Sequence, residues 1–438
     1  MKPMRVNMIT MGCSKNLVDS ESMMAKFAAA GWEVVFDAPG TGYDAVIINT
    51  CGFIHDASQE SINIILEYAE ARKRGETGKL CITGCLSERY KEELIREIPE
   101  ADIILGCDAF DGLRRELNLS ATFCAPEKRL LSTPSHYAYL KISEGCDRKC
   151  SFCIIPAIRG KHISRPVESL VSEARMLAGK GVRELILVAQ DLSSYGTDLY
   201  GRIILGELLE QLSEITNIEW IRVHYAFPAG FPEDILKVMA GNQKVCRYLD
   251  IPLQHISDNV LKRMRRGINR KKTLELIDRI RNRVPGIVLR TTLLTGYPGE
   301  TQRDFDELKD FVSNARFERL GVFPYSHEEG TWAFDNLNDD IPDKEKERRA
   351  AEIMEVQQEI SAGFNRQMIG KEIRVIIDSE EDDHFTGRTE YDSPEVDNEV
   401  FIDKTGNLSA GAFTNVLVTG AGEFDLYARA TGRKKTPP

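Results

Sequence analysis

The chain contains 438 residues, with a net charge of −11 and a sequence pI of about 5.4. Globular domains usually contain about 100–200 residues, so this length predicts about two to four of them. The acidic charge disfavours general binding to nucleic acid, because affinity for phosphate requires positive charge. No run of the sequence approaches the ~18 apolar residues of a membrane-spanning helix.

The first apolar run covers residues 6–10, and it is too short for the hydrophobic region of a signal peptide. We therefore expect a cytoplasmic protein with no membrane partner. In the cytoplasm, cysteines serve as metal ligands or buried thiols more often than as disulfides. The ten cysteines of the chain are accordingly candidate metal ligands.

An N-terminal domain is predicted over residues 1–120, where four apolar runs alternate with amphipathic stretches. The predicted strands are residues 6–10, 45–49, 80–83 and 103–105. The predicted helices are residues 20–31, 58–74 and 88–97. This alternation is typical of an α/β fold with a doubly wound parallel sheet.

Three cysteines each lie just past the carboxyl end of a predicted strand: Cys13, Cys51 and Cys85, here called the N-terminal trio. The carboxyl ends of parallel strands share one edge of the sheet, where ligands bind. Each of these loops opens a helix, whose positive end should lower the thiol pKa and favour a metal-binding thiolate. We expect convergence on one cluster; three unrelated loop cysteines are the alternative. The other cysteines outside the central loop are predicted to be buried or incidental thiols: Cys81, Cys107, Cys124 and Cys246.

Residues 121–135 contain proline, serine and threonine and are predicted to be a linker. A central domain is predicted over residues 136–369, with six strands separated by helical stretches. Its strands are residues 137–142, 185–189, 221–225, 248–251, 287–294 and 320–323. This pattern indicates an open or partial (β/α) barrel with its active face at the carboxyl ends of the strands. A charged helix over residues 340–368 is predicted to present a solvated face.

The first central strand leads into the sequence EGCDRKCSFC, residues 144–153, in which the cysteines have C-x3-C-x2-C spacing. These loop cysteines are Cys146, Cys150 and Cys153. Three thiolates can bind a four-iron cluster and leave one iron open for a small molecule. A zinc site would need a fourth Cys or His nearby, and chance clustering is the other alternative. The loop resembles that of the radical S-adenosylmethionine (SAM) enzymes, which implies a catalytic centre that generates a 5′-deoxyadenosyl radical.

Polar residues at the ends of the following strands are candidates for contact with SAM: Gln190, Asp191, Arg222, Gln254 and Thr291. The alternative for each is a hydrogen bond to nearby backbone. Within the loop, Phe152 is a further candidate by the same resemblance.

Residues 370–438 are predicted to form a small OB-like β-barrel. Its short strands are residues 373–377, 385–388, 399–402, 414–418 and 425–428. Residues 371–432 contain 14 Asp and Glu but only 5 Lys and Arg, a net charge of −9. This acidity suits a basic protein partner better than a phosphate backbone. Surface charge that merely improves solubility is the alternative.

The trio, the loop and the barrel together resemble the methylthiotransferase family over essentially the whole chain. The resemblance implies that the loop cysteines hold a 4Fe-4S cluster that activates SAM. It also implies that the N-terminal trio holds a second 4Fe-4S cluster for sulfur insertion, and that the barrel is a substrate-recognising TRAM domain. Two SAM molecules are implied, one as methyl donor and one as radical source. The radical is needed because acid–base chemistry alone cannot break an unactivated C–H bond. An electron donor and a sulfur donor are implied as partners.

Within that family, four segments look like the branch that modifies an aspartate β-carbon of small-subunit ribosomal protein S-twelve: residues 142–156, 252–255, 292–301 and 387–397. Ribosomal proteins are basic, so the acidic barrel agrees with this branch, and strong nucleic-acid binding is not expected. The branch that methylthiolates transfer-RNA adenosine is the alternative, and it predicts salt-sensitive RNA binding. An iron–sulfur electron carrier without radical chemistry is an alternative from another class.

Overall fold

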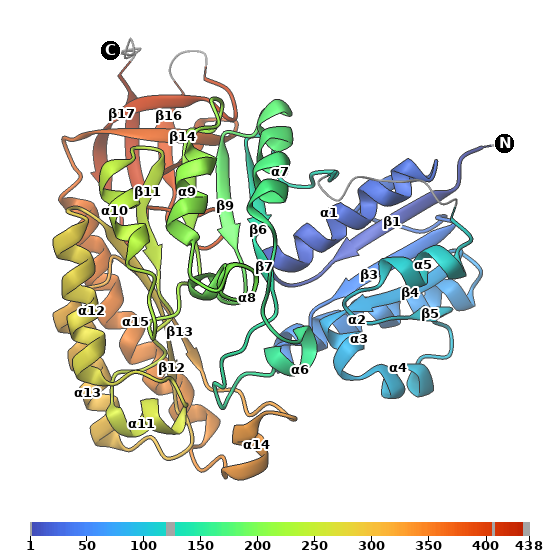
Figure 1. The fold of residues 1–438 in the computed structure, drawn as a ribbon, viewed down its shortest axis with the longest axis horizontal. Helices are drawn as coiled ribbons and strands as arrows, with labels where there is room; N and C mark the ends of the chain where they lie inside the picture. The colour runs from blue at the N-terminus through green and yellow to red at the C-terminus, as the bar shows by residue number, and fades with distance from the viewer. Residues whose placement is uncertain (1, 120–127, 405–407, 432–438) are drawn as a thin grey trace.

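The computed structural model describes residues 2–119, 128–404 and 408–431. Three large sheets follow one another along the chain: a five-stranded sheet, a six-stranded sheet and a closed barrel (Figure 1). Part of the predicted linker and Cys124 lie outside the described residues. The predicted fold class is confirmed.

The N-terminal sheet is parallel throughout, with strand order β2-β1-β3-β4-β5. Its strands are β1 (Arg5–Thr10), β2 (Glu33–Phe36), β3 (Ala45–Thr50), β4 (Lys79–Gly84) and β5 (Ile103–Ile104). Its helices are α1 (Ser14–Ala29), α2 (His55–Lys73), α3 (Cys85–Arg89), α4 (Lys91–Glu97) and α5 (Phe110–Glu116). One apolar core lies under α1 and α5 and another under α2 and α4, so both faces are covered. The edge strand β2 was not predicted, because its four residues are only half-buried and carry a weak pattern.

The central sheet has six parallel strands in the order β13-β12-β11-β10-β9-β6. They are β6 (Tyr137–Lys141), β9 (Glu184–Val188), β10 (Trp220–Val223), β11 (Val245–Asp250), β12 (Val288–Thr295) and β13 (Arg319–Pro324). The covering helices are α7 (Val167–Gly179), α9 (Leu205–Ser213), α10 (Asp234–Gly241), α12 (Arg270–Arg283), α13 (Gln302–Ala315) and α15 (Asp343–Arg366). The two edge strands, β6 and β13, do not pair, so the predicted partial barrel is confirmed.

The prediction that the charged helix, α15, presents a solvated face is wrong in one respect. Lys346 and Arg349 are only 2% and 6% exposed, because the helix packs on β13 and α13. The Lys346 ammonium lies 2.6 Å from Asp339, and the Arg349 guanidinium lies 2.8 Å from Glu300. Its charges are therefore partly internal.

The C-terminal barrel closes in the order β14-β15-β16-β18-β17, as predicted for a small five-stranded barrel. Its strands are β14 (Glu372–Glu380), β15 (His384–Thr389), β16 (Val400–Asp403), β17 (Phe413–Ala421) and β18 (Leu426–Ala430). The barrel docks on residues that directly precede strands of the central sheet. His136, before β6, bonds to Asp378 at 2.8 Å, and Arg183, before β9, donates to the Gly411 carbonyl at 3.1 Å. The barrel thus covers the amino ends of the central strands and leaves their carboxyl ends accessible.

A segment of the barrel, residues 389–398, also lies against the face of the central sheet that the helices leave open. Arg319 donates to Asp392 at 2.8 Å, and Tyr248 donates to Asp397 at 2.7 Å. The guanidinium of Arg290 lies 3.3 Å from Asp397. Several acidic residues of the barrel are therefore internal partners of central-domain arginines.

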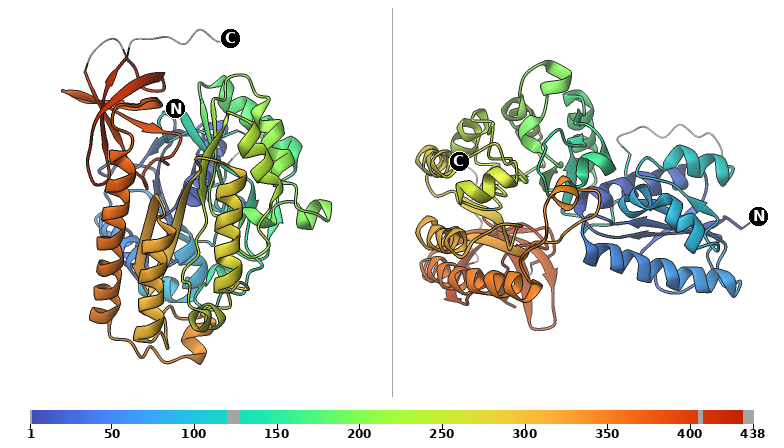
Figure 2. Two further views of the ribbon diagram at one scale, coloured as in Figure 1. Left: turned by 90° about the vertical axis from the view of Figure 1, so that its left-hand side faces the viewer. Right: turned by 90° about the horizontal axis from the view of Figure 1, so that it is seen from below.

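The N-terminal sheet stands to one side of the central sheet, with α1 against β6 (Figure 2). In the described ranges, no helix is both long enough and apolar enough to span a membrane.

A buried ion triad ties the two sheets together. Arg129 donates to Glu21 of α1 at 3.0 Å and to Glu173 of α7 at 2.7 Å, and none of the three side chains is more than 1% exposed. Replacement of Arg129 would leave the buried Glu21 without its ion-pair partner among the described residues, whereas Glu173 would keep Arg165 at 2.7 Å.

We expect Arg129→Met to lower the free energy of unfolding by about 3–5 kcal/mol, because a buried charge loses its partner. Denaturant unfolding followed by circular dichroism measures the change. The control is Arg303→Met, whose side chain is 89% exposed beside Glu307 and should cost less than about 1 kcal/mol. Equal effects of the two substitutions would contradict a stabilising role for the triad.

Candidate functional site between the two sheets

The N-terminal trio lies at the carboxyl edge of the first sheet, as predicted. Cys13 caps the N-terminus of α1, Cys51 follows β3, and Cys85 is the first residue of α3. Cys51 and Cys85 are buried, whereas Cys13 is exposed. The parallel sheet therefore brings three cysteines that are distant in sequence to one end of the domain.

A glycine beside each cysteine lets the three loops approach closely. Gly12 has a φ of +84°, and a Cβ there would lie 2.6 Å from the Cys51 sulfur. A Cβ at Gly52 would lie 2.6 Å from the backbone of Leu86, which follows Cys85 in the chain. Only glycine leaves room for this approach without displacing a neighbouring cysteine loop.

The electrostatics of the trio differ from the sequence-based expectation. Burial raises the pKa of Cys51 to about 11, and negative charge on Cys13 and Cys85 acts in the same direction. The prediction that helix ends lower these pKa values is therefore wrong for Cys51. The pKa of Cys85 is lowered to about 6, first because Cys107 donates a hydrogen bond to its thiolate and then because Arg159 lies against it.

Cys107, predicted to be incidental, is thus a neighbour of the trio. It packs against the small apolar cluster that contains Cys85. The placement rule used for the trio would have found it, because Cys107 also follows the carboxyl end of a strand, β5. By contrast, Cys81 and Cys246 are buried within strands, as predicted.

The loop cysteines follow β6 and the short strand β7 (Ser143–Glu144), which pairs with β8 (Ile163–Ser164). This pairing closes the base of the loop. Gly145 is left-handed, with a φ of +73°, and a Cβ there would lie 2.0 Å from the Lys161 carbonyl oxygen. The loop therefore leaves the carboxyl edge of the central sheet and returns to it, with its base closed by the β7–β8 pair.

Within the loop, burial raises the pKa of Cys146 to about 11 and that of Cys153 to about 12. Negative charge on Cys150 raises both further, so the three thiols lie within electrostatic reach of one another. The Arg266 guanidinium donates to the Cys150 sulfur at 3.2 Å, and the Arg148 amide donates to Cys146 at 3.4 Å. Such donors stabilise thiolates.

Two predicted SAM contacts lie beside the loop. Gln190 donates to Glu144 at 2.6 Å, and its amide oxygen is buried without a hydrogen-bond partner in the described part of the chain. Phe152 packs edge-to-face on Tyr297, with ring centroids 6.5 Å apart. Asp191, at the same strand end, holds the Arg148 guanidinium at 2.7 Å.

The other three predicted SAM contacts, Gln254, Thr291 and Arg222, have different surroundings. Gln254 has a left-handed backbone, with a φ of +72°, next to β12. The Thr291 hydroxyl is buried and donates to the Ile251 carbonyl at 2.8 Å, which is the alternative considered above. Arg222 is fully buried and donates to Glu184, the first residue of β9, and to the Glu390 carbonyl of the barrel. Its guanidinium therefore points toward the amino ends of the strands, and the expectation that it contacts SAM fails.

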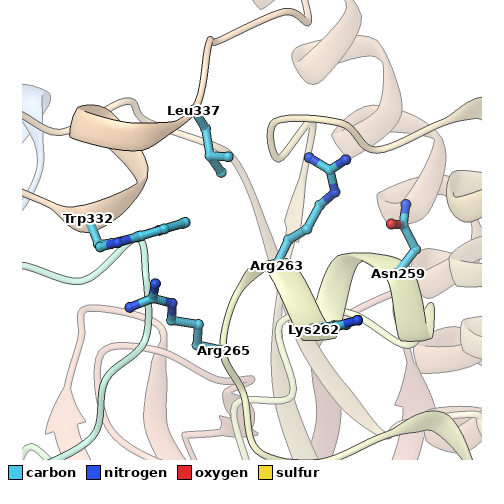
Figure 3. A pocket seen from close by; sticks show the side chains of 6 residues that line it. All are labelled: Asn259, Lys262, Arg263, Arg265, Trp332 and Leu337. Carbon is cyan, nitrogen blue, oxygen red and sulfur yellow. The ribbon is translucent and has the colours of Figure 1, made fainter.

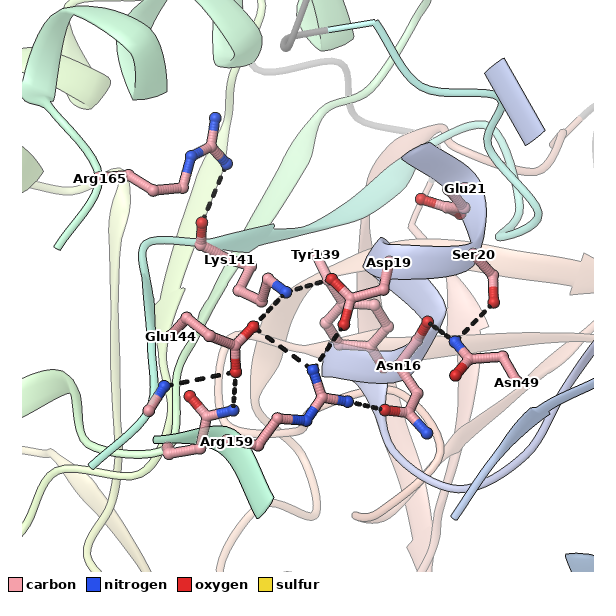
Figure 4. A network of polar contacts seen from close by, with 12 residues as sticks. Asn16, Asp19, Ser20, Glu21, Asn49, Tyr139, Lys141, Glu144, Arg159 and Arg165 are labelled. Carbon is pink, nitrogen blue, oxygen red and sulfur yellow. Dashed lines mark hydrogen bonds and ion pairs between the residues drawn. The ribbon is translucent and has the colours of Figure 1, made fainter. Parts of the chain in front are cut away.

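Arg159, in α6 (Ile155–Arg159), joins the two cysteine sets, and the sequence did not single it out. Its guanidinium donates to the Cys85 sulfur at 3.3 Å and to Asp19 of α1 at 2.8 Å. It also approaches Glu144, which precedes the loop cysteines, at 3.4 Å. Lys141 bonds to both carboxylates and completes the network (Figure 4). One set of charges thus fixes the separation of the trio and the loop.

Lys15 is a second residue that sequence reasoning missed, although it lies only two positions after Cys13. It is half-buried, and its ammonium lies 4.0 Å from the ring centroid of Tyr225, at the carboxyl end of β10. Among the described residues, no carboxylate forms an ion pair with it. Burial lowers the pKa of Lys15, but negative charge on Tyr225, Cys13 and Asp250 raises it overall, so Lys15 carries a positive charge between the trio and the mouth of the central sheet.

The donor sets fit iron–sulfur clusters better than single ions. In the described ranges, no three Cys, His, Asp or Glu side chains converge closely enough to hold one metal ion. A four-iron cluster is wider and takes one thiolate at each of three corners. Each set offers three thiols, and N–H donors from Arg148, Arg159 and Arg266 reach their sulfurs. Hydrogen bonds to ligand sulfurs are a feature of such sites.

Family models match all three parts of the chain. The first, described as "Uncharacterized protein family UPF0004", matches residues 5–106. The Radical SAM superfamily matches residues 140–312, and the TRAM domain matches residues 369–431.

Similar chains named "Ribosomal protein uS12 methylthiotransferase RimO" cover nearly the whole sequence. One from Porphyromonas gingivalis is 55% identical over 431 residues, which are 98% of this chain and 99% of that one. One from Bacteroides thetaiotaomicron is 51% identical over 430 residues, with the same shares covered. The chain belongs to the RimO family. The resemblance to methylthiotransferases and the prediction of a radical SAM enzyme are therefore confirmed.

Among solved structures, the radical SAM methyltransferase TsrM from Kitasatospora setae has a similar fold. Its TM-score is 0.54 at 15% identity, and the match covers 73% of this chain and 72% of that one. The cobalamin-dependent SAM radical enzyme OxsB has a TM-score of 0.50 at 13% identity, over 81% of this chain and 56% of that one. At these identities, the similarity concerns the fold alone.

We expect Gly12→Ala to reduce the iron bound after anaerobic reconstitution, because the new Cβ displaces the Cys51 thiol. The matched control is Gly31→Ala. Gly31 is also left-handed, with a φ of +87°, but a Cβ added there would meet no atom within 4 Å. Both changes incur similar backbone strain, about 1–2 kcal/mol, so iron loss in both variants would assign the effect to strain alone.

Proposed function

We propose that this protein adds a methylthio group to the β-carbon of an aspartate in ribosomal protein uS12, the small-subunit protein S-twelve. The observation that carries the proposal is the 51–55% identity, over 98% of the chain, to relatives named as methylthiotransferases of ribosomal protein uS12. The two facing cysteine sets support it, because the reaction requires both a radical source and a sulfur source. The reaction uses two SAM molecules and two 4Fe-4S clusters.

In this proposal, the loop cysteines hold the 4Fe-4S cluster of the radical centre and the N-terminal trio holds the auxiliary one. When bound, the first supplies the electron that cleaves SAM and the second supplies the sulfur. Arg159 sets the distance between the two sites through Asp19 and Glu144. Gln190 and Phe152 are the proposed SAM contacts beside the loop, and Gln254 is a third at the end of the sheet. Thr291 and Arg222 are not retained, because backbone and carboxylate groups already occupy their polar atoms.

The substrate carboxylate has a suitable partner in Lys15. The nearby carboxylates Asp19 and Glu144 are already paired with Lys141 and Arg159. Lys15 forms no ion pair with a carboxylate in the described ranges, and it lies next to Cys13 and the mouth of the central sheet. It would orient an aspartate whose β-carbon is to receive sulfur.

The proposed domains are an N-terminal domain of residues 1–120, a radical SAM domain of residues 136–369 and a TRAM domain of residues 370–438. The TRAM domain would contact the basic uS12 surface. Its exposed acidic charge is concentrated in the hairpin between β14 and β15, where residues 380–383 are four consecutive acids. The side chain of Glu380 is 53% exposed and that of Asp383 is 89% exposed. The other proposed partners of the protein are a cytoplasmic electron donor and a sulfur donor.

The reaction product tests the proposal directly. The anaerobically reconstituted protein is incubated with SAM, a reductant and uS12, and the product is analysed by mass spectrometry. We expect one methylthio group on a single aspartate. If an anticodon-loop RNA is bound more tightly and modified instead of uS12, the transfer-RNA alternative replaces the proposal.

The two cysteine sets should separate into two activities. We expect Cys153→Ala to abolish both SAM cleavage and methylthio transfer, because the radical centre loses a ligand. We expect Cys51→Ala to retain formation of 5′-deoxyadenosine and to lose methylthio transfer. Quantifying both products by liquid chromatography and mass spectrometry distinguishes the variants; normal methylthiolation by Cys51→Ala would refute the auxiliary role.

A further inference from the structure

A cavity of about 310 Å³ lies between α11 (Asp258–Arg263) and α14 (Trp332–Asn336), and none of the described cysteines lines it (Figure 3). Residues of α11, of the segment that follows it, and of α14 line it. The lining residues are Asn259, Lys262, Arg263, Arg265, Trp332 and Leu337.

The cavity is positively charged, although the protein is acidic overall. Lys262, Arg263 and Arg265 make no ion pair with any carboxylate of the described residues. The Arg265 guanidinium instead lies 3.7 Å from the ring centroid of Trp332, whose side chain is partly exposed. Arg265 also has a left-handed backbone, with a φ of +56°. Strained non-glycine residues of this kind cluster at functional sites.

The wall of the cavity is bonded directly to the cysteine loop. The Ala333 amide, next to Trp332, donates to the Ser151 carbonyl at 2.7 Å. The Ser151 amide in turn donates to the Met264 carbonyl at 3.1 Å. Ser151 follows Cys150 in the chain, and Arg266, from the same segment as Arg265, donates to the Cys150 sulfur at 3.2 Å. The segments that carry the cationic surface are therefore hydrogen-bonded directly to the cysteine loop.

We propose that this surface, composed of Lys262, Arg263, Arg265 and Trp332, is the docking site for the one-electron donor of the radical centre. This inference rests on the proposed function. The partner that fits is a small acidic redox protein that carries a flavin or an iron–sulfur group. Its negative surface complements the three unpaired cations, and the exposed Trp332 offers an apolar contact at their centre.

The transfer is balanced as a single-electron exchange. The reduced donor loses one electron, the centre held by the loop cysteines gains it, and no bond or proton is exchanged between the two proteins. The hydrogen bonds through Ser151 and Arg266 provide a short connection from the surface to the cysteines. The protein's net charge of −11 would repel an acidic donor elsewhere on the surface.

The test uses a triple variant, Lys262→Gln, Arg263→Gln and Arg265→Gln, and a flavodoxin as the acidic redox probe. Two readouts are measured at low salt: the Kd for oxidised flavodoxin, by fluorescence anisotropy, and the rate of 5′-deoxyadenosine formation. We expect the triple variant to bind flavodoxin about tenfold more weakly or worse, and to lose most of the salt dependence of binding. SAM cleavage driven by reduced flavodoxin should fall similarly, whereas cleavage driven by dithionite should be unchanged.

A charge-matched control changes three cations elsewhere: Lys73→Gln, Arg96→Gln and Lys271→Gln. Their side chains are 63%, 69% and 84% exposed. This control should keep the wild-type Kd and the wild-type rate with flavodoxin, which separates the location of the charges from their number.

Three results would overturn the docking site. The first is an unchanged Kd and rate in the triple variant. The second is an equal loss with dithionite, which would assign the cavity to catalysis or substrate binding. The third is a selective loss of binding to a ribosomal RNA oligonucleotide, which would assign it to nucleic acid. If the wild type cleaves SAM but does not methylthiolate uS12, the proposed function fails, while the docking comparison still stands.

Discussion

The structure depends on a small, partly buried network of charges between α1 and the cysteine loop. Arg159 and Lys141 lie between the carboxylates of Asp19 and Glu144. Burial alone raises the pKa of Asp19, but the charges and hydrogen bonds of Lys141 and Arg159 lower it overall, so the carboxylate is ionised at neutral pH. Paired charges of this kind hold well only when each group keeps its partner. The network therefore sets the position of the N-terminal sheet relative to the central one.

This arrangement brings the carboxyl edges of two parallel sheets together. Each sheet presents the carboxyl ends of its strands, where helix-opening loops carry the cysteines. The N-terminal trio lies on one side of Arg159 and the loop cysteines on the other, and Arg159 donates to the Cys85 sulfur. Chemistry that needs a radical and a sulfur atom close together is served by this geometry, because neither sheet alone provides both sites.

The acidic barrel illustrates how charge in a sequence divides between internal and external roles. Asp392 and Asp397 pair with Arg319 and Arg290 of the central sheet, so they do not contribute to a partner surface. The exposed acids are instead concentrated in the hairpin between β14 and β15. The cations around Trp332 show the opposite case, because they remain unpaired among the described residues of an acidic protein. The net charge of the chain does not show which charged residues are paired internally and which are free to contact a partner.

The sequence by itself determined the order of sheets and the two cysteine sets, because strand alternation, strand-end placement and C-x3-C-x2-C spacing are local patterns. It could not determine which strand-end residues face the site. Arg222 and Gln190 were both predicted to lie at strand ends, yet Arg222 lies within β10 and donates to the barrel, whereas Gln190 follows β9 and donates to Glu144 beside the loop. Arg159 and Lys15 likewise gained their significance only from tertiary structure. Their neighbours come from other domains or from distant strands, and contacts between residues far apart in the chain leave no spacing that a single sequence reveals.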